Sequence, residues 1–211
     1  MKSMKWVVCA AAAAGAVAAA MPAAAQEGSW VARFRAVRID TANKSDAVTV
    51  AGVGSLPADA IQVSKKTIPE VDFSYYFTNN LAAELILTVP QKHDVIVPAL
   101  GGRIGDFKQL PPTLTAQWHF LPGQVFDPYV GAGLNLTLIN SVNLPAGLGL
   151  KSTSIGAALQ LGADFNVDKN WSVNVDAKYV QIATDLTQNG NNLGKVHVDP
   201  WLFGVGVGYK F

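Results

Sequence analysis

Apolar and polar residues alternate with a period of two along eight segments of the chain. In the stretch 81–89, for example, Leu81, Leu85 and Leu87 fall on one face while Glu84 and Thr88 fall on the other. A period of two is typical of a β-strand that buries or shields only one of its faces. The segments are 29–37, 67–77, 81–89, 113–120, 128–138, 152–165, 171–179 and 201–211. The pattern therefore predicts eight antiparallel strands.

The connections between these segments favour a transmembrane β-barrel over a secreted β-sandwich, which also has alternating strands. Short links alternate with long ones at roughly 40–66, 90–112, 139–151 and 183–196. Short turns at one end and long loops at the other are characteristic of outer-membrane barrels, as are aromatic residues at the membrane boundary. Seven strand ends on the short-turn side carry an aromatic residue: Trp30, Phe77, Phe120, Tyr129, Phe165, Trp171 and Phe211. The predicted fold is an eight-stranded antiparallel barrel with short periplasmic turns and long extracellular loops.

Residues 1–25 have the composition of a secretory signal peptide. Lys2 and Lys5 precede an apolar run, and the small residues of "PAAAQ" suit cleavage after Ala25. The barrel is then expected to span residues 26–211, as one domain. The only cysteine, Cys9, lies inside the signal segment, so no disulfide is expected.

Charge and composition further restrict the binding partners and the cellular location of the protein. The whole chain carries +1, and without Lys2 and Lys5 the remaining residues carry −1. This balance argues against nucleic acid as a partner, because such binding requires a concentrated basic surface. Only 15% of residues are charged and 50% are hydrophobic. An exported chain this apolar is expected to shield its surface in lipid, with the outer membrane as its location.

Charged residues of both signs fall on the polar faces of the predicted strands and should therefore face the lumen. An unpaired buried charge is costly, so these residues are expected to pair with one another across the barrel and to close it. The predicted polar plug consists of Arg33, Arg35, Glu70, Asp72, Glu84, Asp164, Asp176 and Lys178.

The long loops are unexpectedly apolar for segments that face water. Exposed apolar surface often marks a binding site, so the loops could form a funnel for a ligand, or they could simply pack on one another as a lid. The sequence leaves both interpretations open. The candidate funnel residues are Leu56, Ile61, Val95, Ile96, Leu100, Leu144, Leu148 and Leu150.

Several motifs resemble the outer-membrane protein W (OmpW) family over essentially all of residues 26–211. These motifs are "QKHDV", "GRIGDFKQLPPTLTAQWHF", "FDPYVGAGLN", "WSVNVDAKYV" and "VDPWLFGVGVGYKF". The resemblance implies an eight-stranded barrel of Gram-negative bacteria that is similar to channels for small hydrophobic molecules, alkane-uptake relatives included. It further implies a narrow apolar passage that opens outside and exits sideways into the membrane lipid, above a lumen blocked by polar residues. His93 and His119 fall inside these motifs, whereas the first loop, 43–66, departs from the family pattern.

The end of the chain also resembles a recognition signal. A final strand that closes on Tyr209 and Phe211 is similar to the segment that the barrel-assembly machinery reads, so this machinery is an expected partner.

The sequence allows three alternatives to transport. A structural or adhesion barrel would have a sealed lumen and no solute flux. A lipid enzyme would need a nucleophile and a base, for which His93, Asp94 and Ser141 are the available residues. A metal site would need three or four converging ligands, for which His93, Asp94 and His197 are the candidates. No spacing in the sequence demands either site, so no catalytic residue, metal or cofactor is predicted.

Overall fold

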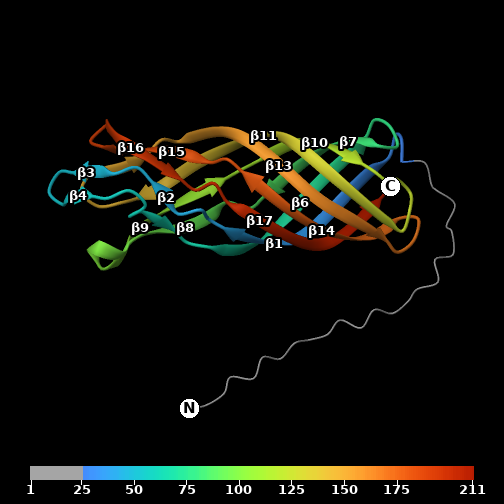
Figure 1. Ribbon diagram of the computed structural model, residues 1–211, viewed down its shortest axis with the longest axis horizontal. Coiled ribbons are helices and arrows are strands. Elements are labelled where there is room, and N and C mark those ends of the chain that lie inside the picture. The colour runs from blue at the N-terminus through green and yellow to red at the C-terminus, as the bar shows by residue number, and fades with distance from the viewer. Residues whose placement is uncertain (1–25) are drawn as a thin grey trace, which may run out of the picture.

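The computed structural model describes residues 26–211, and the predicted signal peptide lies outside them. Eight antiparallel strands form a closed barrel in which each strand pairs with its neighbours in sequence and the last pairs with the first (Figure 1). This confirms the predicted fold. The strands are β1 (Trp30–Asp40), β6 (Lys66–Tyr76), β7 (Leu81–Thr88), β10 (Thr113–His119), β11 (Phe126–Asn143), β13 (Thr153–Asn166), β14 (Trp171–Val180) and β17 (Trp201–Lys210).

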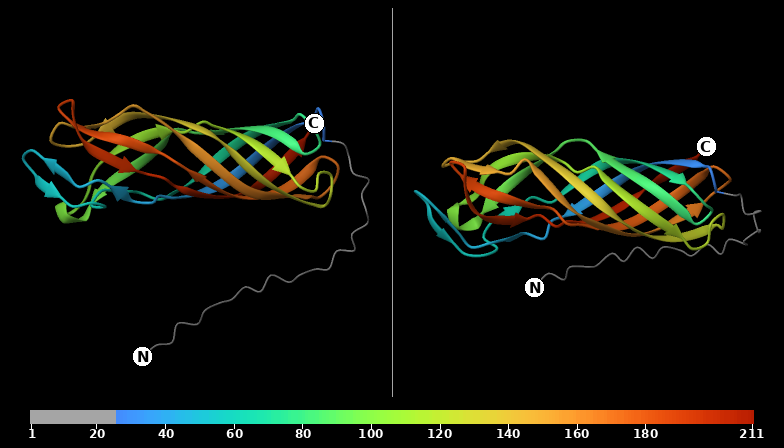
Figure 2. Two further views of the ribbon diagram at one scale, coloured as in Figure 1. Left: turned by 45° about the horizontal axis from the view of Figure 1, so that its top comes forward. Right: turned by 90° about the horizontal axis from the view of Figure 1, so that it is seen from above.

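The long connections predicted between the barrel strands contain short strands of their own. They form an extension at the end of the barrel far from the C-terminus, which the two views of Figure 2 also show. Apolar backbone packed away from water must pair its N–H and C=O groups, and these segments pair them as short strands. The extension contains β2 (Lys44–Ser45), β3 (Val48–Val50), β4 (Gly54–Leu56), β5 (Gln62–Val63), β8 (Gln91–Val97), the 3₁₀ turn η1 (Pro98–Leu100), β9 (Gly102–Leu110), β12 (Leu148–Leu150), β15 (Ala183–Gln188) and β16 (Asn191–His197).

The outer face of the barrel is apolar and ends in an aromatic belt at the short-turn end. Six of the seven predicted belt residues have exposed rings. The seventh, Tyr129, is fully buried in the lumen. The prediction that Tyr129 lies in the belt was wrong. Tyr129 and Asp127 are two residues apart on β11, so both side chains point into the lumen, and both are buried. Phe126 takes its place, with its ring centroid 5.3 Å from that of Phe165.

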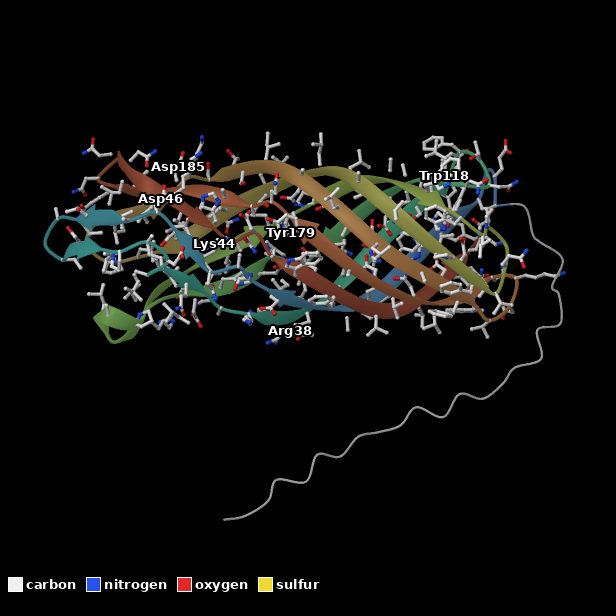
Figure 3. The ribbon with its side chains drawn as sticks, in the orientation of Figure 1. Arg38, Lys44, Asp46, Trp118, Tyr179 and Asp185 are labelled. Carbon is white, nitrogen blue, oxygen red and sulfur yellow. The ribbon has the colours of Figure 1, made fainter. Side chains whose placement is uncertain are left out.

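Tyr209 lies in the same belt, with its ring 4.9 Å from that of Trp171 and 6.4 Å from that of Phe211. Figure 3 shows Trp118 at this end of the barrel, whereas Tyr179 lies near its middle. The residues 26–211 include no helix that is long and apolar enough to cross a membrane.

The lumen is occupied by a buried network of charges centred on Arg35. The Arg35 guanidinium lies 2.7 Å from Asp72, 3.0 Å from Glu70, 3.2 Å from Asp176 and 3.5 Å from Glu84. All eight residues of the predicted plug lie in this network, and none is more than 7% exposed. Charges this deeply buried remain ionised only when oppositely charged groups compensate them.

The other two cations extend the network to the neighbouring carboxylates. Arg33 contacts Asp164 at 2.6 Å and Glu84 at 3.3 Å. Lys178 contacts Glu70 at 2.8 Å and Asp176 at 3.2 Å. The three cations and five carboxylates therefore form one connected layer.

Neutral amides complete the layer, and they were missing from the predicted plug. The side-chain nitrogens of Gln117 and Gln160 donate to Glu84 at 2.8 and 2.9 Å, and Gln160 also donates to Asp176 at 2.8 Å. These bonds occupy carboxylate lone pairs that the cations leave free, which is a condition for a stable buried ion network.

Strand β17 makes room for the network with glycines. A Cβ atom added at Gly206 would lie 2.1 Å from the Phe34 carbonyl oxygen and 2.7 Å from the Arg35 side chain. The bare face of the closing strand thus gives the arginine the space to reach its four carboxylates.

We expect Arg35→Met to lower the free energy of unfolding by about 3–5 kcal/mol, because it leaves four buried carboxylates without their shared cation. Urea unfolding in lipid vesicles measures this loss. The control is Arg38→Met on the same strand, since Arg38 is exposed and forms no ion pair within residues 26–211. Equal stabilities of the two variants would show that the network does not hold the barrel together.

Candidate functional site

An apolar cavity, here called the upper cavity, lies inside the extension. Its volume is about 650 Å³, including the part that opens to solvent. Thr184 supplies the only polar side chain among its lining residues. The walls come from segments far apart in the chain, among them β4, β8, β9 and β15, so the cavity exists only when the extension is folded.

The structure brings together seven of the eight candidate funnel residues. Those that line the upper cavity are Leu56, Ile61, Val95, Leu100, Leu144, Leu148 and Leu150.

Ile96 is the exception, and its placement in the funnel was wrong. Its neighbours Val95 and Val97 on β8 line the cavity, and their side chains are buried. Because side chains alternate along a strand, Ile96 points to the opposite face, where it is half-buried.

A second cavity, here called the lower cavity, lies between the upper cavity and the plug. Its volume is about 410 Å³, including the part that opens to solvent, and it has a mixed lining. Ile39, Ile86, Val180, Ile182 and Leu202 are among its apolar walls. Its polar lining residues are Thr88, Gln91, Gln109, Thr113 and Asn135, together with the plug residues Glu70 and Lys178.

A buried histidine separates the polar from the apolar part of β8. The inward residues of this strand run Gln91, His93, Val95, so polarity falls towards the outside. The ring of His93 stacks on Phe107 with 5.8 Å between centroids. The level of His93 therefore marks the change from the mixed lining of the lower cavity to the apolar lining of the upper cavity.

The hydrogen bonds of His93 define its tautomer. Its Nδ1 lies 2.8 Å from the carbonyl oxygen of Ser64, so Nδ1 carries the hydrogen and donates it. Burial lowers the pKa of His93, so the ring is neutral near pH 7. Its Nε2 is then an acceptor, and Gln109 Nε2 donates to it at 3.2 Å.

The sheet is interrupted beside the lower cavity. The ladder between β7 and β10 ends at the pair Ile86–Thr113, and the ladder between β8 and β9 resumes at the pair Gln91–Gln109. Within residues 26–211, no ladder pair joins the segments 87–90 and 110–112. Pro90, Pro111 and Pro112 fall in this interval and cannot donate a backbone hydrogen bond.

This interruption lies between the lower cavity and the apolar outer face. The cavity lining includes Thr88 on one edge and Pro111 on the other. On the outer face nearby, Val89 and Leu114 are 53% and 57% exposed. At this interruption the described part of the barrel wall has no ladder pairs between the two edges that separate the lower cavity from the outer face.

The residues considered for catalysis and metal binding do not converge. His93 points inward, whereas the Asp94 carboxylate bonds to Arg103 at 2.7 Å on the outside. Ser141 is exposed on β11, and His197 Nδ1 lies 3.4 Å from Asp199. In the described part of the chain, His, Cys, Asp and Glu form no group of three or more that could hold a metal ion.

Sequence reasoning missed Gln91, Phe107 and Gln109, although the signal for them was present. In 91–97, Gln91, His93 and Val95 alternate with Lys92 and Asp94, and further along Phe107 and Gln109 alternate with Lys108. This is the same period of two that identified the barrel strands, and it would have placed these residues on an inward face.

Comparison with known proteins shows the family. The OmpW family model matches residues 26–211. The chain is 39% identical to the uncharacterized outer-membrane protein y4mB of Sinorhizobium fredii, covering 86% of this chain and 80% of that one. It is 32% identical to the outer membrane protein W of Vibrio cholerae, with 99% and 100% covered.

A solved structure supports the same assignment. The crystal structure of the outer membrane protein OprG from Pseudomonas aeruginosa superposes with a TM-score of 0.76 at 28% identity, covering 88% of this chain and 97% of that one. With an eight-stranded barrel and an apolar outer face, the chain belongs to the OmpW family of outer-membrane proteins.

Proposed function

We propose that this protein gives small hydrophobic molecules a passive route from the outside into the outer membrane, with a lateral exit through the barrel wall. The proposal rests on the order of three features along the barrel. An apolar cavity lies at the outer end, a charged plug fills the lumen, and the sheet is interrupted between them.

Entry into the upper cavity requires no energy source. Removing apolar surface from water is favourable by about 25 cal/mol per Å², so a hydrophobic solute partitions into a cavity lined almost wholly by aliphatic side chains. The extension shields the solute while it crosses the polar headgroup region.

Exit through the lumen would require the solute to pass between buried ion pairs. Displacing Arg35 or Lys178 from its carboxylates would leave charges unpaired in a low-dielectric interior, which costs several kcal/mol per ion. Separating the edges of the wall at 87–90 and 110–112 breaks no ladder pair. The sideways route therefore has the lower barrier.

The second candidate is a structural or adhesion barrel without transport. The observation that favours it is that most of the upper-cavity walls belong to one continuous buried cluster, which also contains Val37, Ile39 and Ile68 of the barrel. In that case the apolar residues serve only to pack the extension, and a polar substitution at the cavity would leave solute movement unchanged.

Leu56→Lys is expected to slow delivery of an apolar fluorophore, because it places a charge in the path of the solute. The assay uses vesicles with lipopolysaccharide in the outer leaflet and follows the fluorescence gained as diphenylhexatriene reaches the bilayer. We expect about a tenfold slower protein-dependent rate, equivalent to ~1.4 kcal/mol. The matched control, Ile96→Lys on the outward face of β8, should retain the wild-type rate. Wild-type delivery by a folded Leu56→Lys variant would favour the structural barrel.

Thr88→Trp tests the lateral exit, because Thr88 lines the lower cavity at the edge of the interruption. The indole should fill this space and slow delivery several-fold while the upper cavity still binds the fluorophore. Thr67→Trp is the control, since Thr67 is exposed on the outside of β6. If both variants deliver the fluorophore at the wild-type rate, the exit lies elsewhere.

A further inference from the structure

The lower cavity contains a buried hydrogen-bond acceptor that no donor satisfies. Gln109 is 1% exposed and lines this cavity. Within residues 26–211, no donor lies within hydrogen-bonding distance of its Oε1 atom. An unpaired buried acceptor costs free energy, so a bound molecule that supplies a donor is stabilised there.

The orientation of the Gln109 amide is fixed by its neighbour. Because His93 Nδ1 donates to the Ser64 carbonyl at 2.8 Å, His93 Nε2 can only accept. The Gln91 amide presents its oxygen 3.4 Å from this atom and gives its own nitrogen to Thr88 at 3.0 Å, so Gln109 is the donor to His93 Nε2, at 3.2 Å. Turning the amide over would place two acceptors against each other, so Oε1 remains the atom without a partner.

The remaining lining excludes ionic partners for this acceptor. Lys178 and Glu70 both line the lower cavity, but they are bonded to each other at 2.8 Å. A carboxylate has no hydrogen to donate to Gln109 Oε1. An ammonium group would be a buried charge without a carboxylate free to compensate it, which is costly. The matching group is a neutral donor attached to an apolar chain.

We propose that the lower cavity is a binding site for the hydroxyl end of aliphatic alcohols, with Gln109 Oε1 accepting the hydroxyl hydrogen and the alkyl chain against Ile86, Val180 and Ile182. The inference rests on the proposed function, since it assigns a preferred class of solute to the same route. An alkane can pass through the site but leaves Oε1 unpaired, whereas an alcohol pairs it.

The test measures competition by octane, 1-octanol and octanoate against diphenylhexatriene delivery in the lipopolysaccharide vesicles, with each concentration corrected for partitioning into protein-free vesicles. Wild-type protein should be inhibited more strongly by 1-octanol than by octane, by about fivefold, as expected for one hydrogen bond to a buried acceptor. Octanoate should compete no better than octane.

Gln109→Met removes the acceptor while keeping a side chain of similar length. This variant should lose the preference for 1-octanol and keep its inhibition by octane, which also shows that it is folded. Gln62→Met is the control, because Gln62 lies on β5 and lines neither cavity, and it should keep the preference.

Each other result overturns the inference. An equal response of the wild type to octane and 1-octanol, or a preference that persists in Gln109→Met, removes the alcohol site while leaving the hydrophobic route intact. Failure of both octane and 1-octanol to compete, with no protein-dependent delivery, removes the route and the alcohol site together.

Discussion

The Arg35 guanidinium contacts four buried carboxylates, and these contacts determine how the lumen of the barrel is filled. A barrel of eight strands has an interior that side chains can fill, and here the filling is ionic. Each carboxylate is acceptable in the interior only because a cation or an amide reaches it. The glycines of β17 follow from the same constraint, since a larger residue at Gly206 would collide with Arg35.

A charged layer at this depth divides the molecule into two parts with different chemistry. Below it, buried hydrogen bonds continue: His119 lies 2.9 Å from Asp127 and 3.1 Å from the Tyr76 hydroxyl. Above it, the interior becomes progressively apolar, from Gln91 through His93 to Val95. On the proposed route, a hydrophobic solute from outside would meet this charged layer, and the interruption of the sheet lies beside the lower cavity just above it.

The barrel could be predicted from the sequence because its constraints are local and periodic. Each strand must present an apolar face to lipid, so Leu81, Ala83, Leu85 and Leu87 recur at every second position, and the charges on the other face had to lie in the lumen. The extension was harder to predict. Val95 and Ile96 are equally apolar, and they differ only in which face of β8 their side chains occupy. The interruption of the sheet depends on where two ladders stop, which is a property of strand pairing and not of any single segment.

The proposed route requires a lumen that is closed and an apolar path through the wall that is open. It is tested most directly by recording, on the same lipopolysaccharide vesicles, the ion conductance of the membrane and the rate at which diphenylhexatriene reaches the bilayer. Wild-type protein should accelerate delivery of the fluorophore and leave ion conductance at the level of protein-free vesicles. Increased ion conductance without accelerated delivery would contradict the proposed route.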